Sequence, residues 1–399
     1  MSFLKKTNIP QILFLILVLA SCGKDNKSTK TQVATVEEDT LPKMKPLGPE
    51  KKITQAYANS VNGRINHFYT KNWPNNSMNG SFLVAKNGQI IFERYNGYAN
   101  KNEGTKITAE TPVQIASVSK VLTATAILKL VNAGKIDLDQ KVNTILKTFP
   151  YEACTIRMLL SHRTGMRNYA YFTDHDKSVW DRHNQLTNKD ILDILATKDI
   201  GLESTPGTRF SYCNTNYAML ALIIEKITGL KYKEAMNQMI FKPLGMTHTY
   251  VFDDDKERKS IVPSYKGNNA EIGFDYLDNV YGDKNIFSTV RDLLKFDRAR
   301  NSPDFLKPEL LKQVYTGYSN ERKGEKNYGL GIRMINWDSG QNFYFHNGWW
   351  HGNTSSYITL MNEDVTIIAL SNKMTRKTYA TRKLAPIFGD YPFNFKDEE

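Results

Sequence analysis

Alternating hydrophobic and polar positions first become clear near residue 81. The run SFLVAK is followed by Asn87-Gly88 and then by QIIFERYNGYA, and both runs are rich in β-branched and aromatic residues. Asn-Gly between two such runs is typical of a tight hairpin turn. Near the other end, FYFHN is followed by SSYITLMN and DVTIIALSN, with Asn362-Glu363 as a turn. The pattern therefore predicts antiparallel strands at both ends of the chain.

Between these two groups of strands the pattern is helical. The run VLTATAILKLVNAG after Lys120 is apolar on nearly every side, which is typical of a buried central helix that ends at Gly134. Further helices are expected near 188–197 and 215–228, and a last one near 376–386. This order of elements predicts an α/β (α+β) fold with a central antiparallel sheet made of N- and C-terminal strands. Helices flank the sheet, and the large insertion at about 137–280 is mostly helical.

Composition adds limits on function but does not change this fold class. Hydrophobic residues make up 40% of the 399 residues, as is ordinary for a globular protein. The net charge is +12, yet the basic residues are spread along the chain with no arginine-rich run. We therefore interpret the charge as a basic solvated surface and expect no nucleic-acid partner.

The N-terminus has the pattern of a targeting segment. Lys5 and Lys6 precede a short apolar run at 12–20, which fits a signal peptide better than a membrane-spanning helix. The run ends in Leu19-Ala20-Ser21-Cys22, which resembles a bacterial lipobox. We expect Cys22 to be lipidated and the protein to be anchored in the cell envelope, facing the periplasm or in the outer membrane. An ordinary signal peptide with a chance cysteine is the alternative.

The expected domain organisation follows from these patterns. Residues 1–22 form a lipoprotein signal peptide, and 23–52, rich in Lys, Thr, Asp, Glu and Pro, form a flexible tether. Residues 53–399 form one folded domain. Cys154 and Cys213 remain as a possible disulfide pair, which the sequence leaves open.

Ser117 and Lys120 are the first candidates for chemistry. They stand at i and i+3 where the central helix begins, so they share a helix face. A serine hydroxyl needs a base that takes its proton during attack, and a lysine can serve when its surroundings lower its pKa. A helix N-terminus also offers N–H groups to an oxyanion. A capping serine beside a surface lysine is the alternative for this pair alone.

Two later motifs strengthen the catalytic interpretation. Tyr212 and Asn214 follow a Pro-Gly turn. Tyr212 would relay protons near Lys120, and Asn214 would form a hydrogen bond with Lys120 or with a substrate amide. His346 and Gly348 open a predicted strand. His346 would supply a proton donor or a positive charge opposite Tyr212, and Gly348 would let a ligand approach the backbone. Packed structural roles for these residues are the alternative.

Taken together, Ser-x-x-Lys, Tyr-x-Asn and His-x-Gly in this order resemble the serine β-lactamase and penicillin-binding-protein superfamily. The similarity is greatest to its class C β-lactamase-related branch of esterases and DD-peptidase-like enzymes, and it covers about residues 80–375. Secondary matches are LLSHRTGM at 159–166, PLGM at 243–246, IFST at 286–289 followed by Asp292-Leu293, and YGLG at 328–331.

The resemblance implies a role for each motif. Ser117 would be the acylated nucleophile, and Lys120 and Tyr212 would share the base and acid work. Asn214 would position the substrate, and His346 takes the place of the lysine found in true β-lactamases.

The resemblance also implies an oxyanion hole from the backbone N–H groups of Ser117 and Trp349. Trp349-Trp350 fills positions that are usually small in this superfamily. A pocket floor that is aromatic or occluded is therefore expected. Together with His346, this departure argues against an efficient β-lactamase. His162 is expected to be structural.

These observations predict a serine hydrolase with an acyl-Ser117 intermediate. Its substrate would be an ester, a D-amino-acid peptide or a related acyl compound in the envelope, peptidoglycan-derived peptides included. A weak β-lactamase or DD-carboxypeptidase, and a non-catalytic envelope binding protein that retains the fold, are alternatives. No cofactor or metal is expected, because His175, His183 and the acids around them lack the spacing of known metal motifs.

Overall fold

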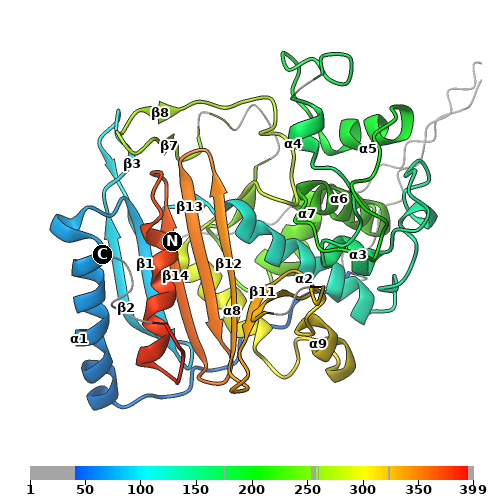
Figure 1. Cartoon of the computed structure of the whole chain (residues 1–399). Helices are drawn as coiled ribbons and strands as arrows, with labels where there is room; N and C mark the ends of the chain where they lie inside the picture. The colour runs from blue at the N-terminus through cyan, green and yellow to red at the C-terminus, as the bar shows by residue number, and fades with distance from the viewer. Residues whose placement is uncertain (1–40, 175, 253–257, 259, 322–323, 394–399) are drawn as a thin grey trace, which may run out of the picture. The chain divides into compact units, whose positions relative to one another are not determined.

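The computed structural model describes residues 41–174, 176–252, 258, 260–321 and 324–393. Its main sheet has seven strands in the order β10-β11-β12-β13-β14-β1-β2, and every neighbouring pair is antiparallel. The strands are β1 (Gly80–Lys86), β2 (Gln89–Asn96), β10 (Lys326–Tyr328), β11 (Arg333–Asn336), β12 (Asn342–Trp350), β13 (Asn353–Leu360) and β14 (Val365–Ser371). Strand β14 lies beside β1, so both ends of the chain build one sheet, as predicted (Figure 1).

The β1–β2 hairpin forms where the sequence predicts it. Asn87 and Gly88 have φ values of 55° and 81°, which is the conformation of a turn that matches strand twist. Asp364, in the connection between β13 and β14, also has a positive φ of 52°. The local sequence pattern therefore predicted both hairpins correctly.

Each face of the sheet is covered by helical segments. Helix α1 (Gln55–Asn72), capped by the Thr54 side chain, and the 3₁₀ helix η7 (Lys377–Ile387) cover one face (Figure 1). Their core includes the fully buried Ile65, Phe82 and Leu384. The opposite face packs against α8 (Val290–Arg300) and the short helix η3 (Ala116–Val118).

Helix α2 (Ser119–Asn132) is buried over nearly its whole length, as its apolar sequence predicts. It packs against α6 (Asn214–Thr228), which also contacts α3 (Ile156–Leu160) and α5 (Asn188–Thr197). Helices are the main regular elements of the insertion at 137–280, as expected, but loops and turns make up the larger part of its described residues, and it also holds short strands. The remaining helical elements are η2 (Pro74–Asn76), η4 (Val142–Thr144), α4 (Tyr169–Phe172), α7 (Tyr232–Met236), η5 (Asn237–Phe241) and α9 (Pro308–Val314). The remaining strands are β3 (Tyr98–Asn100), β4 (Thr105–Lys106), β5 (Val113–Gln114), β6 (Tyr250–Val251), β7 (Ser264–Tyr265), β8 (Glu271–Ile272) and β9 (Ile286–Ser288).

The segment expected to be a flexible tether, 23–52, is corrected at its carboxyl end. Leu41 and Met44 are buried in the main core, and the Met44 N–H donates to the carbonyl oxygen of Met239 at 2.7 Å. Burial of these two apolar side chains favours the packing of this part of the chain on the core. The signal peptide, Cys22 and the tether up to residue 40 lie outside the described residues.

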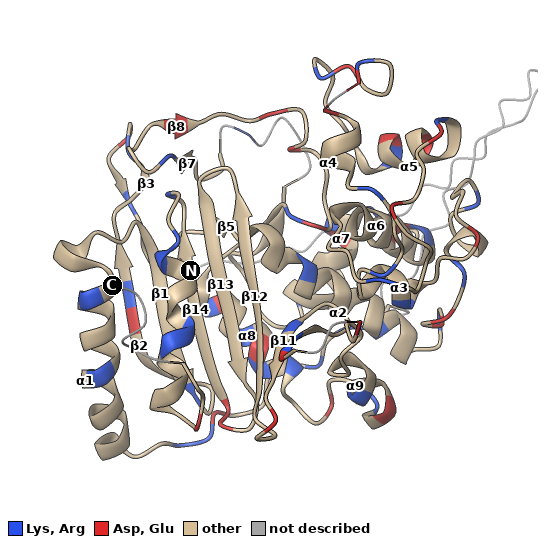
Figure 2. Ribbon diagram, viewed as in Figure 1, with Lys and Arg blue, Asp and Glu red and all other residues tan. Residues whose placement is uncertain are grey.

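Two further expectations concern cysteines and charge. Cys154 and Cys213 are both free and buried, so the possible disulfide is not formed. In the described part of the chain, Lys and Arg are scattered over many elements and alternate with acids (Figure 2). None of the helices there combines the length and apolar character that crossing a membrane requires.

Candidate active site

Ser117 and Lys120 meet where η3 passes into α2. The Lys120 Nζ lies 3.2 Å from the Ser117 Oγ and donates to the carbonyl oxygen of Asp283 at 2.8 Å. Lys120 is fully buried, while Ser117 is half-buried. Ala116, just before the serine, has a positive φ of 47°, a strained conformation that is common at functional sites. The lysine predicted as the base is therefore in contact with the predicted nucleophile.

Strand β12 runs directly past the nucleophile. A Cβ on Gly348 would lie 2.9 Å from the backbone nitrogen of Ser117 and 2.5 Å from the carbonyl oxygen of Ile115. The Ser355 hydroxyl in β13 donates to the same carbonyl at 2.6 Å. The glycine is thus needed for the close approach of the chain that carries Ser117, and the approach of a ligand to its backbone stays a prediction.

Tyr212 lies in a cluster of aromatic rings beside Lys120. The Lys120 Nζ is 5.2 Å from the centre of the Tyr212 ring, and the His162 ring packs at 4.4 Å from it. His162 is fully buried, and its Nδ1 accepts the Cys213 N–H. Burial, followed by the charge of Lys120, lowers the pKa of His162 well below its ordinary value. This neutral histidine supports Tyr212, in line with the expected structural role.

Asn214 is the first residue of α6, and its side-chain oxygen is buried. Within the part of the chain that the structure describes, this Oδ1 accepts no hydrogen bond. No bond from Asn214 to Lys120 is present among those residues either, because Lys120 is held by Ser117 and Asp283. A buried acceptor without a partner is costly, so Asn214 is suited to receive an N–H group from a ligand.

The sequence left two roles open for His346, a proton donor or a positive charge, and the structure does not support the positive charge. His346 is fully buried, and burial, with smaller effects of Arg333 and Lys120, lowers its pKa well below the ordinary value. Its Nδ1 lies 2.9 Å from the carbonyl oxygen of Asn347, which can only accept, so this nitrogen carries the proton. Nε2 then accepts from the Tyr328 hydroxyl at 3.3 Å. His346 lies opposite Tyr212 as expected, with ring centres 6.3 Å apart, but it is neutral.

The two tryptophans after Gly348 point in different directions because side chains alternate along a strand. The Trp349 side chain is 60% exposed, and its indole N–H donates to the His351 carbonyl at 2.9 Å. Trp350 is half-buried, and its indole N–H donates to the Asp278 carboxylate at 2.7 Å. Only Trp350 therefore contributes an aromatic surface on the side of β12 that faces Ser117.

With this geometry in place, similarity to known proteins is informative. The profile of the family described as Beta-lactamase matches residues 76–387. The chain belongs to this family. Penicillin-binding protein 4* of Bacillus subtilis (strain 168) is 30% identical over 315 residues, which cover 74% of this chain and 68% of that protein.

Several solved structures have a similar fold. The octameric penicillin-binding protein homologue from Pyrococcus abyssi has a TM-score of 0.70 and 25% identity, and the match covers 83% of this chain and 78% of that one. D-amino acid amidase from Ochrobactrum anthropi SV3 has a TM-score of 0.63 at 21% identity, with 83% and 96% of the chains covered. That second likeness concerns the fold alone. The mixed α/β fold predicted from the sequence is thus the fold of this family.

Arg333 also lies at the site, although the sequence did not predict it. It stands in β11, half-buried, with its guanidinium carbon 4.7 Å from the centre of the Tyr212 ring and 5.9 Å from that of Tyr328. In the described part of the chain, its side chain has no carboxylate partner. No motif marks it, since only the pairing of β11 with β12 brings it to the site. It provides the cation that His346 does not.

Asp283 and Lys284 were also missed, although a signal was present. These two charged residues lie just before the buried strand β9 (Ile286–Ser288), separated from it by Asn285, and both are nearly inaccessible to solvent. Charged side chains are seldom fully buried unless they are paired. Two charged residues beside a buried strand are therefore a sequence signal for a functional site.

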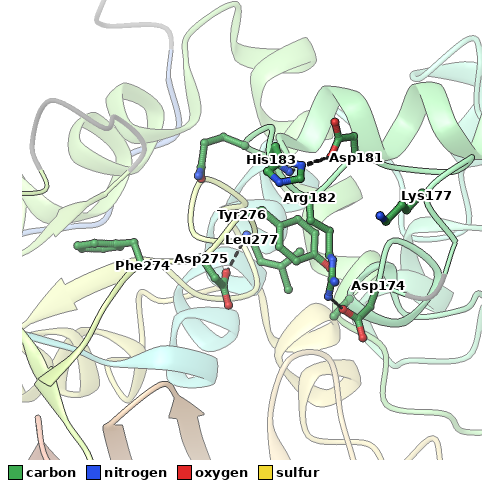
Figure 3. Close-up of a pocket in the computed structure, with 11 residues that line it drawn as sticks. Asp174, Lys177, Asp181, Arg182, His183, Phe274, Asp275, Tyr276 and Leu277 are labelled. Carbon is green, nitrogen blue, oxygen red and sulfur yellow. Dashed lines mark hydrogen bonds and ion pairs between the residues drawn. The ribbon is translucent and has the colours of Figure 1, made fainter. Parts of the chain in front are cut away.

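A cavity of about 670 Å³ lies between the segments 170–185 and 274–277 (Figure 3). Two acids near His183 that line this cavity already have partners. Asp174 pairs with Arg182, and Asp181 contacts His183 at 2.7 Å. His175 lies outside the described residues. A different group, Asp275, Asp278 and His351, has ligand atoms within 4.8 Å of one another. Its central carboxylate, Asp278, already accepts from Trp350 and contacts His351.

Proposed function

We propose that this chain is a serine hydrolase that forms an acyl-enzyme at Ser117. The observation that carries the proposal is the position of the Lys120 Nζ, 3.2 Å from the Ser117 Oγ and 2.8 Å from the Asp283 carbonyl oxygen. A carbonyl can only accept, so Lys120 gives one N–H to Asp283, and this bond is retained when Lys120 has lost its extra proton. Its lone pair is then free to face the serine hydroxyl.

The reaction follows from this arrangement. The Lys120 amine takes the hydroxyl proton while the Ser117 Oγ attacks the carbonyl carbon of the substrate. Backbone N–H groups of Ser117 and Trp349 are the expected donors to the oxyanion, and one such donor contributes ~3 kcal/mol. The C–X bond to the leaving group breaks, and the leaving group takes the proton from Lys120 or through Tyr212. Water then attacks the ester of Ser117 in the same way, and the free acid is released.

Two groups at the site support a small substrate with an amide and a carboxylate. The buried Oδ1 of Asn214, without a partner among the described residues, is suited to accept an amide N–H. The guanidinium of Arg333, over the Tyr212 ring, is suited to bind a carboxylate. Peptides that end in a D-amino acid have both groups. The name of the relative from Bacillus subtilis, Penicillin-binding protein 4*, is in line with this class.

The proposed location is the bacterial cell envelope, with lipid on Cys22 as the anchor. The support is the sequence pattern of the first 22 residues alone.

Labelling with a fluorescent fluorophosphonate and with a fluorescent penicillin tests the acyl-enzyme. We expect a covalent adduct on the wild type that maps to Ser117 and is lost in Ser117→Ala. An unlabelled wild type, or an equal adduct on Ser117→Ala, would contradict the proposal. A binding protein that only retains the fold would give that result.

A further inference from the structure

The segment 282–286 is fastened to the face of α2 that carries the proposed base. Thr123 donates to the Gly282 carbonyl at 2.6 Å, Lys120 donates to the Asp283 carbonyl at 2.8 Å, and the Ile286 N–H donates to the Ser119 hydroxyl at 3.2 Å. Gly282 has a φ of 94°, and a Cβ there would lie 2.4 Å from the carbonyl oxygen of Tyr217 in α6. The segment is therefore held between α2 and α6.

The side chain of Asp283 is anchored on the other side by Tyr169. The Tyr169 hydroxyl donates to the Asp283 carboxylate at 2.9 Å, and both residues are fully buried. Burial, followed by the charge of Asp283, raises the pKa of Tyr169 well above its ordinary value. The phenol therefore keeps its proton and remains a donor to the carboxylate.

Lys284 completes this arrangement with a second buried amine beside the site. Its Nζ donates to the Tyr169 hydroxyl at 2.6 Å and to the Val280 carbonyl at 3.2 Å, and it lies 4.6 Å from the centre of the Trp350 ring. The Asp283 carboxylate is 3.7 Å away. Burial lowers the pKa of Lys284, and the Asp283 charge opposes this effect. The ammonium has three N–H groups, and these contacts give each of them a partner.

We propose that Asp283, Lys284 and Tyr169 form a positioning unit that holds the Asp283 carbonyl against Lys120. This inference rests on the proposed function, in which Lys120 takes the Ser117 proton. Because the carbonyl fixes one N–H of the Lys120 amine, it also fixes the direction of the lone pair toward the Ser117 hydroxyl. A displacement of about 1 Å at a catalytic group can reduce the rate about 100-fold.

Stability alone is a poor reason for such an arrangement. A buried ion pair often contributes little net stability, since the desolvation of both charges offsets their attraction. Removing one partner is nevertheless costly, so loss of stability and loss of positioning must be separated by experiment. The chain offers a matched control for Lys284 in Lys129, a buried lysine in α2. It donates to the Phe305 carbonyl at 3.1 Å, and burial likewise lowers its pKa.

The experiment compares Lys284→Met, Tyr169→Phe and the control Lys129→Met in turnover of a p-nitrophenyl ester, with the melting temperature of each variant. We expect Lys284→Met and Tyr169→Phe to lower kcat about 10–100-fold while KM stays within about 2-fold, because positioning acts on the chemical step. Lys129→Met is expected to lower the melting temperature while kcat stays within about 3-fold.

A pair of variants at Asp283 adds a readout that a purely structural role would not move. The main-chain carbonyl is present in both, but only Asp283→Asn keeps an acceptor for the Tyr169 hydroxyl. Asp283→Asn is therefore expected to retain more kcat than Asp283→Ala at equal KM. If Lys284→Met does not fold, Tyr169→Phe, which removes a single hydroxyl, decides the question.

Two outcomes distinguish this inference from the function on which it rests. A wild type that turns over the ester, with Lys284→Met and Tyr169→Phe equally active, would overturn the positioning unit and leave the acyl-enzyme proposal intact. A wild type that is never acylated at Ser117 would overturn both.

Discussion

The Tyr328 hydroxyl donates to Nε2 of His346 across 3.3 Å, and this contact suits the neutral imidazole that burial favours. Since Nδ1 faces the Asn347 carbonyl, both ring nitrogens are occupied in the neutral form. A second proton on the ring would face a phenol oxygen in a fully buried place close to Arg333 and Lys120. The site thus has a neutral imidazole where the sequence suggested a proton donor or a positive charge.

Stability should therefore fall as the medium becomes mildly acidic. Burial lowers the pKa of both His346 and His162 in the folded state, so below about pH 6.5 only the unfolded chain binds these protons. The stabilisation is complete above the unfolded pKa and decreases as the pH falls. Between about pH 7.5 and pH 5.5 we expect a loss of roughly 1 kcal/mol for each histidine, measured by urea unfolding. His183→Gln, at an exposed histidine, should leave this slope unchanged.

Replacing Lys120 tests the proposed base. Lys120→Met should reduce the rate of Ser117 acylation by about 10²–10⁴, the usual contribution of a general base. The measurement is stopped-flow acylation by an activated ester, with Ser117→Ala as the baseline. Acylation near the wild-type rate in a folded Lys120→Met protein would mean that another group takes the proton.

Arg333 tests the carboxylate end of the substrate. Arg333→Gln should raise KM about 10–100-fold for a peptide with a free terminal carboxylate, because a charged hydrogen bond contributes about 1.5–3 kcal/mol. For the matching peptide with a neutral terminal amide, the change should be small. Arg291→Gln, at a partly exposed arginine that pairs with Glu93, serves as the control. Equal losses for both peptides would argue against carboxylate recognition.

The two cysteines of the folded domain should be unreactive. Burial raises the pKa of Cys154 to about 12 and that of Cys213 to about 11, so almost no thiolate exists at neutral pH. A form that begins after Cys22 should therefore take up no aromatic disulfide reagent when folded. In urea it should react at both thiols. Fast labelling without denaturant would contradict the buried, free state of these cysteines.

Cys22 tests the proposed anchor. Bacteria that express the full chain and are fed an alkyne fatty acid should incorporate the label, and the protein should sediment with membranes. Cys22→Ala should lose the label and much of the membrane association, since the acyl chains supply the apolar contact. Membrane association without any label on the wild type would show that a different anchor is used.

Several features of this protein were predictable because they depend on neighbours in the sequence. The β1–β2 hairpin follows from Asn87-Gly88, whose backbone adopts the required positive φ values. Helix α2 follows from a continuous apolar run. Ser117 and Lys120 meet because residues three apart share one helix face. The tether boundary was less accurate, since Leu41 and Met44 pack on distant core residues that no local pattern reveals.

The sequence by itself therefore determined the sheet-forming ends of the chain, the central helix and the identity of the proposed nucleophile and base. Only the tertiary structure decided the charges and contacts around them. Burial made His346 neutral, strand pairing brought Arg333 over Tyr212, and packing of 282–286 on α2 brought the Asp283 carbonyl to Lys120. The physical reason is that protonation and hydrogen bonding depend on desolvation and on partners far away in the sequence.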